Sequence, residues 1–333
     1  MKIKETMEKI PGGLMIVPMF IAAILNTFAP NLLRIGNFTQ ALFVDGLLTL
    51  IALFLLCSAA QINIKNAGRA VGKGATLLIL KWVVGAGIGL IGFMFAGPNG
   101  LFLGVAPLAI VAAMMNSNGA LYVSLVSQYG KEDDKAAYGL LALNDGPFLT
   151  MVALTIFGAM GFVDGLFSPV TFVAVVLPIV LGFVLGNLDE NMREFLTKGS
   201  DVFIPFMAFA VGMTINLKVI VEGGLSGVIL GLLTVFLTGG AGYLVFKAFG
   251  WNPMVGASEG STAGNAIATP AVIAAASASF ASTAEIATVQ VAASTVTTAI
   301  VLPIFISFLA KRLEKKHGKG IYHPKDVVQP IGK

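Results

Sequence analysis

Two polar, glycine-containing interruptions within long apolar segments constrain the fold of this chain more than any other feature. They lie at residues 114–120 and 258–265, and both combine glycine with serine and asparagine. The hydrocarbon core of a membrane offers backbone amides no water, so a nonhelical segment survives there only where protein or a solvated cavity satisfies its hydrogen bonds. Interruptions at corresponding positions in two halves of a chain are typical of the discontinuous helices that form substrate sites in secondary transporters.

Composition places these interruptions in a membrane. The 333 residues are 56% hydrophobic and 11% charged, with a mean hydropathy of +0.89, whereas globular proteins carry about 25% charged residues. A spanning helix needs about 20 predominantly apolar residues. The sequence therefore predicts an all-α polytopic membrane protein. Its ten predicted transmembrane helices cover residues 12–29, 41–62, 74–95, 100–129, 136–160, 167–187, 200–217, 225–248, 252–279 and 284–310.

The distribution of basic residues predicts the orientation of these spans. With a cytoplasmic N-terminus, 18 of the 21 Lys and Arg residues fall in cytoplasmic segments, two fall in outside loops, and Lys81 falls within the third span. This bias follows the positive-inside rule and predicts that both termini are cytoplasmic. Because the basic residues flank apolar segments, the net charge of +4 gives no indication of nucleic-acid binding.

Short matches between the two halves of the chain predict an internal repeat. The matching segments are residues 16–19 with 176–179, 61–65 with 214–218, and 118–119 with 264–265. Because five spans per half is an odd number, the second five-helix repeat is expected to be inverted relative to the first. The first repeat covers residues 1–161 and the second residues 162–310, followed by a cytoplasmic polar tail at residues 311–333. Chance similarity between apolar helices is the alternative.

Each interruption is expected to start a second half-helix near the middle of the membrane. The free amides and the positive dipole end of a helix N-terminus favour an anion such as a carboxylate. Polar side chains beside the two breaks are suited to bonding substrate hydroxyls. The candidate substrate-binding residues are Asn116, Ser117, Asn118, Gly119, Ser261, Thr262, Gly264 and Asn265. The alternative is that glycine and serine only allow close helix packing.

Three ionisable residues, Asp145, Glu259 and Lys81, fall deep within predicted spans, away from the span ends. Each costs at least ~2.5 to 3.5 kcal/mol on insertion scales, which makes such residues candidates for function. A carboxylate at this depth can take up a proton or bind sodium, so Asp145 and Glu259 are candidates for ion coupling, with Lys81 as a counter-charge to Asp145 or to the substrate. The alternatives are a structural pairing of Asp145 with Lys81, and snorkelling of Lys81 to the interface.

Several other chemistries are excluded by residue content. Cys57 is the single cysteine, and the two histidines, His317 and His323, lie in the polar tail. The sequence therefore predicts no cofactor and no thiolate or imidazole metal site, which leaves sodium at Glu259 as the one metal ion to consider. No segment resembles a phosphate-binding loop, a nucleophile elbow or a metalloprotease helix, so an enzyme is not expected.

Segments over nearly the full chain together resemble the bacterial 2-keto-3-deoxygluconate permease family. They are Lys9–Pro18, Asn26–Pro30, Val111–Met114, Leu121–Tyr122, Gln128–Gly130, Leu177–Pro178, Leu185–Asp189, Arg193–Phe195, Ile204–Phe206 and Ala268–Pro270. The resemblance implies uptake of 2-keto-3-deoxygluconate, a sugar acid from pectin breakdown, across the cell inner membrane by proton symport.

The resemblance also implies the fold of the bile acid, arsenite and riboflavin transporter superfamily. That fold has two inverted five-helix repeats and crossed, discontinuous helices 4 and 9. Spans 3, 4, 5, 8, 9 and 10 would form a core domain, and spans 1, 2, 6 and 7 a panel domain. An elevator-type mechanism, in which the core slides on the panel, is the expected route of alternating access.

The resemblance leaves the coupling ion and the choice among close substrates open. Glu259 matches a sodium-binding glutamate of the bile acid relatives, whereas Asp145 matches an acidic residue of the permeases and favours H+. A sodium-coupled symporter of another organic anion or sugar acid is the alternative. A passive channel would need a continuous polar face, and a membrane sensor a soluble output domain. The sequence does not decide between a monomer and a homo-oligomer.

Overall fold

The computed structural model describes residues 2–9, 13–62, 70–135, 137–144, 146–163, 169–318, 320 and 322. Apart from a single bridge between Phe102 and Val105, the regular structure of these residues is helical. The α-helices are α1 Ile3–Glu8, α2 Gly13–Phe28, α3 Asn37–Phe43, α4 Leu47–Ala60, α5 Ala70–Ala96, α6 Pro107–Met115, α7 Gly119–Tyr129, α8 Glu132–Lys135, α9 Tyr138–Leu141, α10 Phe148–Ala159, α11 Pro169–Leu188, α12 Glu190–Gly212, α13 Leu217–Leu233, α14 Gly240–Ala248, α15 Pro253–Ala257, α16 Thr269–Ala276 and α17 Ala281–His317.

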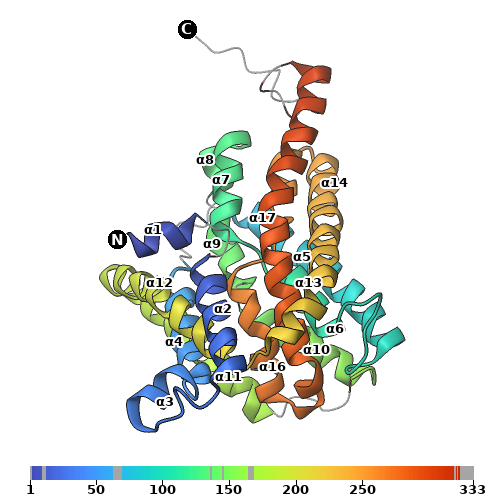
Figure 1. Cartoon of the computed structure of the whole chain (residues 1–333). Helices are drawn as coiled ribbons and strands as arrows, with labels where there is room; N and C mark the ends of the chain where they lie inside the picture. Colours follow the sequence, from blue (N-terminus) through green and yellow to red (C-terminus); the bar gives the residue numbers. More distant parts are fainter. Residues whose placement is uncertain are drawn as a thin grey trace.

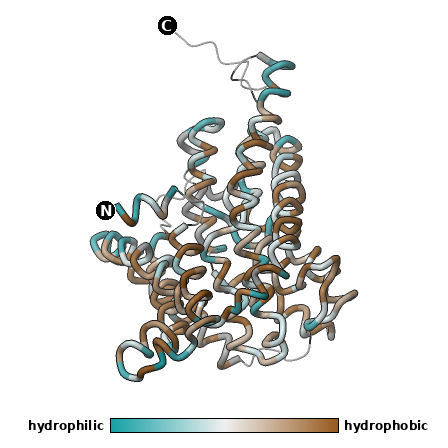
Figure 2. Tube along the Cα trace, viewed as in Figure 1, coloured by the Kyte–Doolittle hydropathy of each residue, from teal (hydrophilic) through white to brown (hydrophobic). Residues whose placement is uncertain are grey.

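Several of these helices are long and apolar enough to cross a membrane. Four helices are long and apolar enough on their own. Counting each of the bent pairs α3 with α4 and α6 with α7 as one span raises the number to six among the described residues. The other predicted spans correspond to shorter apolar helices, such as α2 and α10. Figure 2 shows hydrophobic residues along most helices and hydrophilic ones at the ends, as in the last turns of α17. The chain is therefore a helical, multi-pass membrane protein, and the number of ten spans stays a prediction.

The helices pack as two groups. Helices α2, α4, α11 and α12 contact chiefly one another and form the four-helix group, on the left in Figure 1. The broken-helix group comprises α5 to α7, α9, α10 and α13 to α17, with α13 against α17, α5 against α6 and α14 against α15. Fewer contacts join the groups, for example between α10 and α11 and between α13 and α2.

Glycine allows backbone contact between helices of the four-helix group. A Cβ atom on Gly182 of α11 would lie 1.9 Å from the carbonyl oxygen of Leu56, and one on Gly186 would lie 2.1 Å from that of Ala60. Helices α11 and α4 can approach this closely only because these positions lack side chains. The single cysteine, Cys57, is 3% exposed and packs beside Gly199 of α12.

Two asparagine side chains make corresponding hydrogen bonds in the two halves of the chain. Asn26, near the end of α2, donates to the carbonyl of Ile215 just beyond α12, at 3.1 Å. Asn187, near the end of α11, donates to the carbonyl of Ile62 just beyond α4, at 2.8 Å. In each case the amide satisfies a backbone carbonyl in the loop just beyond a helix end. Ile62 and Ile215 occupy the same place in the matched segments 61–65 and 214–218, whereas Asn187 lies one residue beyond the position that the first match gives for Asn26.

A π-helical turn at Thr234–Gly239 joins α13 to α14. Insertions of this kind occur often beside functional sites. Here the turn ends at Gly239, where a Cβ atom would lie 3.2 Å from the Cα of Gly260 in the second interruption. The turn therefore brings the backbone of this long helix directly against the second helix break.

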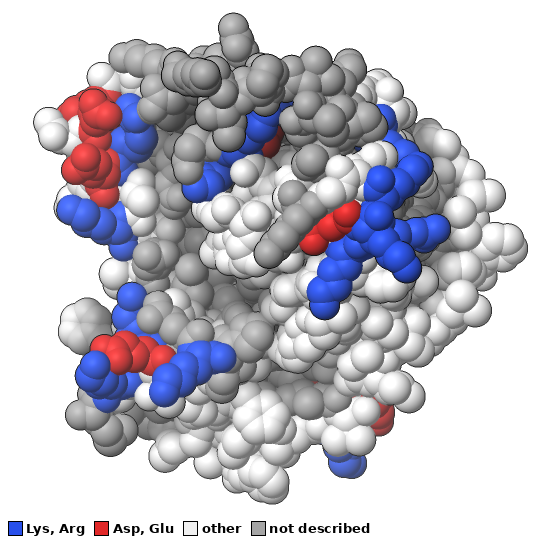
Figure 3. All heavy atoms as spheres, turned by 90° about the horizontal axis from the view of Figure 1, so that it is seen from above, with Lys and Arg blue, Asp and Glu red and all other residues white. Residues whose placement is uncertain are grey.

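Basic and acidic side chains gather on the face of the molecule at which α17 terminates. Figure 3 looks onto this face and shows several groups of Lys and Arg among its described side chains. Lys73, close to the start of α5, forms an ion pair there with the buried carboxylate of Asp134. This face is the one that the charge distribution predicts to be cytoplasmic.

Candidate substrate and ion site

The first predicted interruption is confirmed as a helix break. Helix α6 ends at Met115, α7 begins at Gly119, and the two halves are bent by 45°. Asn118 caps α7, because its side-chain oxygen accepts a hydrogen bond from the Leu121 amide at 3.0 Å. Asparagine at this position satisfies one of the amides that a helix N-terminus leaves free.

The second predicted interruption is also a break, but the chain resumes differently. Helix α15 ends at Ala257, and a 3₁₀ turn, Asn265–Ala268, precedes α16, which begins at Thr269. Pro270 lies in the first turn of α16, where its missing N–H costs little. The α-helical N-terminus expected near Gly264 therefore lies several residues later than predicted.

The two breaks contact each other through buried polar groups. The Asn118 amide donates to the Ser261 hydroxyl at 2.9 Å. The Ser117 hydroxyl donates to the Glu259 carboxylate and accepts from the Asn144 side chain at 2.8 Å. Glu259 is 2% exposed, and its second carboxylate oxygen, Oε2, has no hydrogen-bond partner in the structure. We call Ser117, Asn144 and Glu259 the carboxylate cluster.

Lys81 of α5 enters the same junction. Its side chain is 2% exposed, so it does not snorkel to the membrane interface. The ammonium donates to the backbone carbonyl of Glu259 at 2.7 Å and to that of Ser261. It also lies close enough to the Glu259 carboxylate for electrostatic attraction. The structure thus places Lys81 beside Glu259, whereas Asp145, the predicted partner of the lysine, lies outside the described residues.

Other predicted site residues hold the breaks in place. Asn116 accepts from the Gly146 amide at 2.9 Å and donates to the carbonyl of Ala112 at 2.8 Å. Thr262 is bonded through its amide to Thr298 at 3.0 Å and through its hydroxyl to Ser294 at 2.8 Å. Both residues are buried and point into the protein. Their hydrogen bonds fix the unwound backbone, as buried polar groups require.

Three side chains in these contacts, those of Asn144, Ser294 and Thr298, are absent from the predicted site. Asn144 follows α9 in a 3₁₀ turn, and its neighbour Asp145, the predicted coupling residue, lies outside the described residues. Ser294 and Thr298 lie four residues apart on α17, and therefore on one face of that helix. The sequence does contain a signal for Ser294 and Thr298. Two polar residues on one face of an otherwise apolar span are expected to face protein, because a face exposed to lipid would be apolar.

Four predicted residues remain partly accessible, two at each break. Asn118 and Gly119 lie at the first, and Gly264 and Asn265 at the second. The side-chain oxygen of Asn265 is buried and has no hydrogen-bond partner in the structure. An acceptor left in this state costs free energy unless a ligand or water reaches it.

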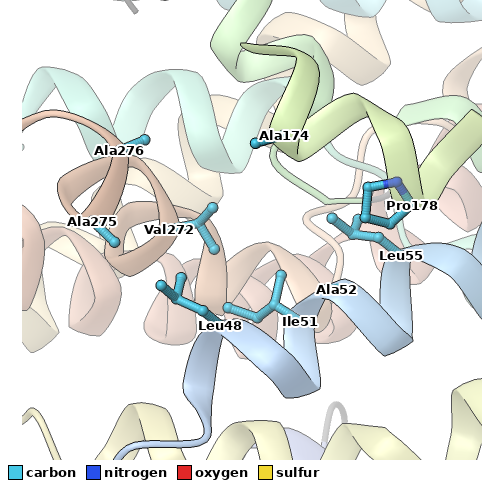
Figure 4. A pocket seen from close by; sticks show the side chains of 9 residues that line it. All are labelled: Leu48, Ile51, Ala52, Leu55, Ala174, Pro178, Val272, Ala275 and Ala276. Carbon is cyan, nitrogen blue, oxygen red and sulfur yellow. The ribbon is translucent and has the colours of Figure 1, made fainter. Parts of the chain in front are cut away.

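An apolar cavity of about 300 Å³ lies elsewhere, between the two helix groups. Figure 4 shows its lining side chains, which come from α4, α11 and α16 and include Ile51, Pro178 and Val272. None of the predicted site residues lines it. A site for a polar ligand contains a few polar groups that fix the orientation of the ligand, whereas the side chains that line this cavity are all apolar.

Comparison with known proteins identifies the family. Residues 4–315 match the family model described as 2-keto-3-deoxygluconate permease. The chain is 47% identical to 2-keto-3-deoxygluconate permease 1 of Salmonella typhimurium over 312 residues, which is 94% of this chain and 96% of that protein. It is 39% identical to the 2-keto-3-deoxygluconate permease of Bacillus subtilis over 323 residues, or 95% and 96% of the two chains. The chain therefore belongs to the 2-keto-3-deoxygluconate permease family.

Proposed function

We propose that this protein imports 2-keto-3-deoxygluconate across the cell inner membrane by cation-coupled secondary transport. The observation that carries the proposal is the contact between two helix breaks, with a buried carboxylate at their junction, in a chain whose relatives are permeases for this compound. Discontinuous helices of this kind form the substrate and ion sites of secondary transporters.

The substrate is expected to bind at Asn118, Gly119, Gly264 and Asn265. These residues are partly accessible and flank both breaks. The carboxylate of the sugar acid would lie near the free amides at the start of α7, because a helix N-terminus favours an anion. The unpartnered oxygen of Asn265 would accept a hydrogen bond from a substrate hydroxyl. Ser117, Asn116, Ser261 and Thr262 would act by holding this geometry.

The coupled cation is expected to act at Glu259. Its Oε2 atom is buried without a partner, and a proton or a sodium ion would satisfy that oxygen. We favour H+, because the resemblance to the permeases implies proton symport and a single proton would satisfy this unpartnered oxygen. Asp145 remains a second proposed coupling residue from the sequence. Sodium coupling is the competing proposal.

Alternating access would follow from relative movement of the two helix groups. In this proposal the broken-helix group is the core and the four-helix group is the panel of a ten-helix inverted repeat, with both termini cytoplasmic. The corresponding bonds of Asn26 and Asn187 support the repeat. The sparse contacts and the apolar cavity between the groups support an elevator-type movement.

Uptake of labelled 2-keto-3-deoxygluconate into proteoliposomes tests this function. Saturable accumulation is expected under an inward proton gradient, and excess unlabelled substrate should compete more strongly than taurocholate. Accumulation under a sodium gradient alone would support sodium coupling. Absence of saturable sugar-acid uptake under either gradient, in protein that is folded, would contradict the proposed substrate.

Replacing Asn265 with alanine is expected to raise the KM for this substrate about tenfold, since one neutral hydrogen bond contributes about 1 kcal/mol or slightly more. The maximal rate should change less, because the side chain makes no described contact with the carboxylate cluster. Initial uptake rates over a range of substrate concentrations measure both quantities. An unchanged KM would remove Asn265 from the proposed substrate site.

A further inference from the structure

Lys81 reaches the second break because of the face on which it lies. Gly85, Gly89 and Gly92 follow it on one face of α5, at the spacing that aligns side chains along a helix. This face packs closely on α6, and a Cβ atom on Gly85 would lie 2.9 Å from the side chain of Met115. Since α6 ends at Met115, Lys81 lies beyond that end and enters the junction.

The Lys81 ammonium meets backbone oxygens of an unwound segment. It donates hydrogen bonds to the carbonyls of Glu259 and Ser261, which belong to the nonhelical residues after α15. Unwound carbonyls at membrane depth coordinate alkali cations in transporters with discontinuous helices. A lysine ammonium is likewise a compact monovalent cation, and it carries three donors.

We propose that Lys81 is a tethered cation, which takes at these two carbonyls the place of a free monovalent ion. Removing the ammonium would open a site for Na+, K+ or a small alkylammonium, formed by the carbonyls of Glu259 and Ser261 beside the Glu259 carboxylate. Lys81 would thus be a positioning residue that fixes the backbone of the second break. No free ion from either side of the membrane would then be needed at these two carbonyls.

In the described part of the second half, no lysine occupies the position that corresponds to Lys81. Gly239 contacts the end of α15 much as Gly85 contacts the end of α6. The residue four positions before Gly239 is Val235, which is buried and apolar, whereas the residue four positions before Gly85 is Lys81. Among the described residues, the bound ammonium is therefore found at one break and not at its counterpart.

Thermal unfolding of purified Lys81→Ala in different salts tests the proposal. The variant should unfold at a lower temperature than the parent, because two buried carbonyls and a carboxylate lose their cation. Sodium, potassium or methylammonium chloride should then raise its Tm by about 3 °C relative to N-methyl-D-glucamine chloride of equal ionic strength, as expected for a ligand near ten times its Kd.

Controls separate this effect from general salt stabilisation. The parent protein and Lys73→Ala, which alters a lysine of the same helix paired with Asp134, should show no preference among these cations. If Lys81→Ala does not fold, the comparison is made with Lys81→Gln. A variant whose Tm is unchanged, or falls without cation-specific recovery, overturns the proposal. The inference extends the proposed coupling at Glu259, but this measurement involves no transport, so either can fail separately.

Discussion

Replacing Glu259 with glutamine is expected to abolish concentrative uptake while leaving the protein folded. Glutamine keeps the size of the side chain and an oxygen that can accept from Ser117, but it cannot bind a proton or neutralise Lys81. With one coupled proton, a pH gradient of one unit supports about tenfold accumulation of substrate. The variant should equilibrate its substrate across the membrane and accumulate none.

The control for this prediction is Glu222→Gln, which makes the same chemical change at an exposed position of α13. It should retain accumulation. Asp145→Asn belongs in the same experiment, because the sequence predicts a second coupling carboxylate. Accumulation by folded Glu259→Gln equal to that of the parent would place coupling at another group, and loss in Asp145→Asn alone would assign it to Asp145.

Replacing Gly242 with alanine is expected to destabilise the broken-helix group severely. A Cβ atom on Gly242 of α14 would lie 2.1 Å from the carbonyl oxygen of Gly256 in α15, and one on Gly256 would lie 2.2 Å from that of Gly242. The obstacle is backbone and cannot rotate away, so the helices must separate. The cost should exceed the ~1–3 kcal/mol typical of overpacked side chains. It should appear as a lower Tm and aggregation on size-exclusion chromatography.

Gly240→Ala provides a matched control two residues earlier in the same helix. No atom lies within 4 Å of the position that its Cβ would take. Alanine favours helix over glycine by up to about 1 kcal/mol, so this variant should be as stable as the parent or slightly more stable. Equal stability of the two alanine variants would show that α14 and α15 do not make backbone contact.

The sequence predicts the positions of the breaks well, because their physical cause is local. Hydrocarbon does not tolerate free backbone groups, so polar and glycine residues in an apolar span mark unwinding directly. The break at residues 116–118 follows this prediction closely. The later start of α16, after the 3₁₀ turn at Asn265–Ala268, is not predicted; the unwound segment before it is held by a tertiary contact, from Thr262 to Thr298 of α17, that residue spacing does not specify.

Side-chain direction within the site could not be predicted in the same way. Asn116 and Asn118 are two residues apart and of one type, yet Asn116 is buried against Gly146 while Asn118 caps α7 and stays partly accessible. Similarly, Lys81 is close enough in sequence to the end of its span to snorkel, and only the packing of α5 on α6 directs it inward. Such choices depend on tertiary contacts that residue spacing does not specify.

The burial of Cys57 makes the chain well suited to spectroscopic labelling. Its thiol is covered where α4 packs on α12, so a maleimide should react with cysteines introduced at exposed positions and leave the native one unmodified. One spin label or fluorophore on α12 and another on α14 would report the distance between the two helix groups. A change in that distance on substrate addition would measure the displacement of one group along the other, whereas local opening of a gate would leave it constant.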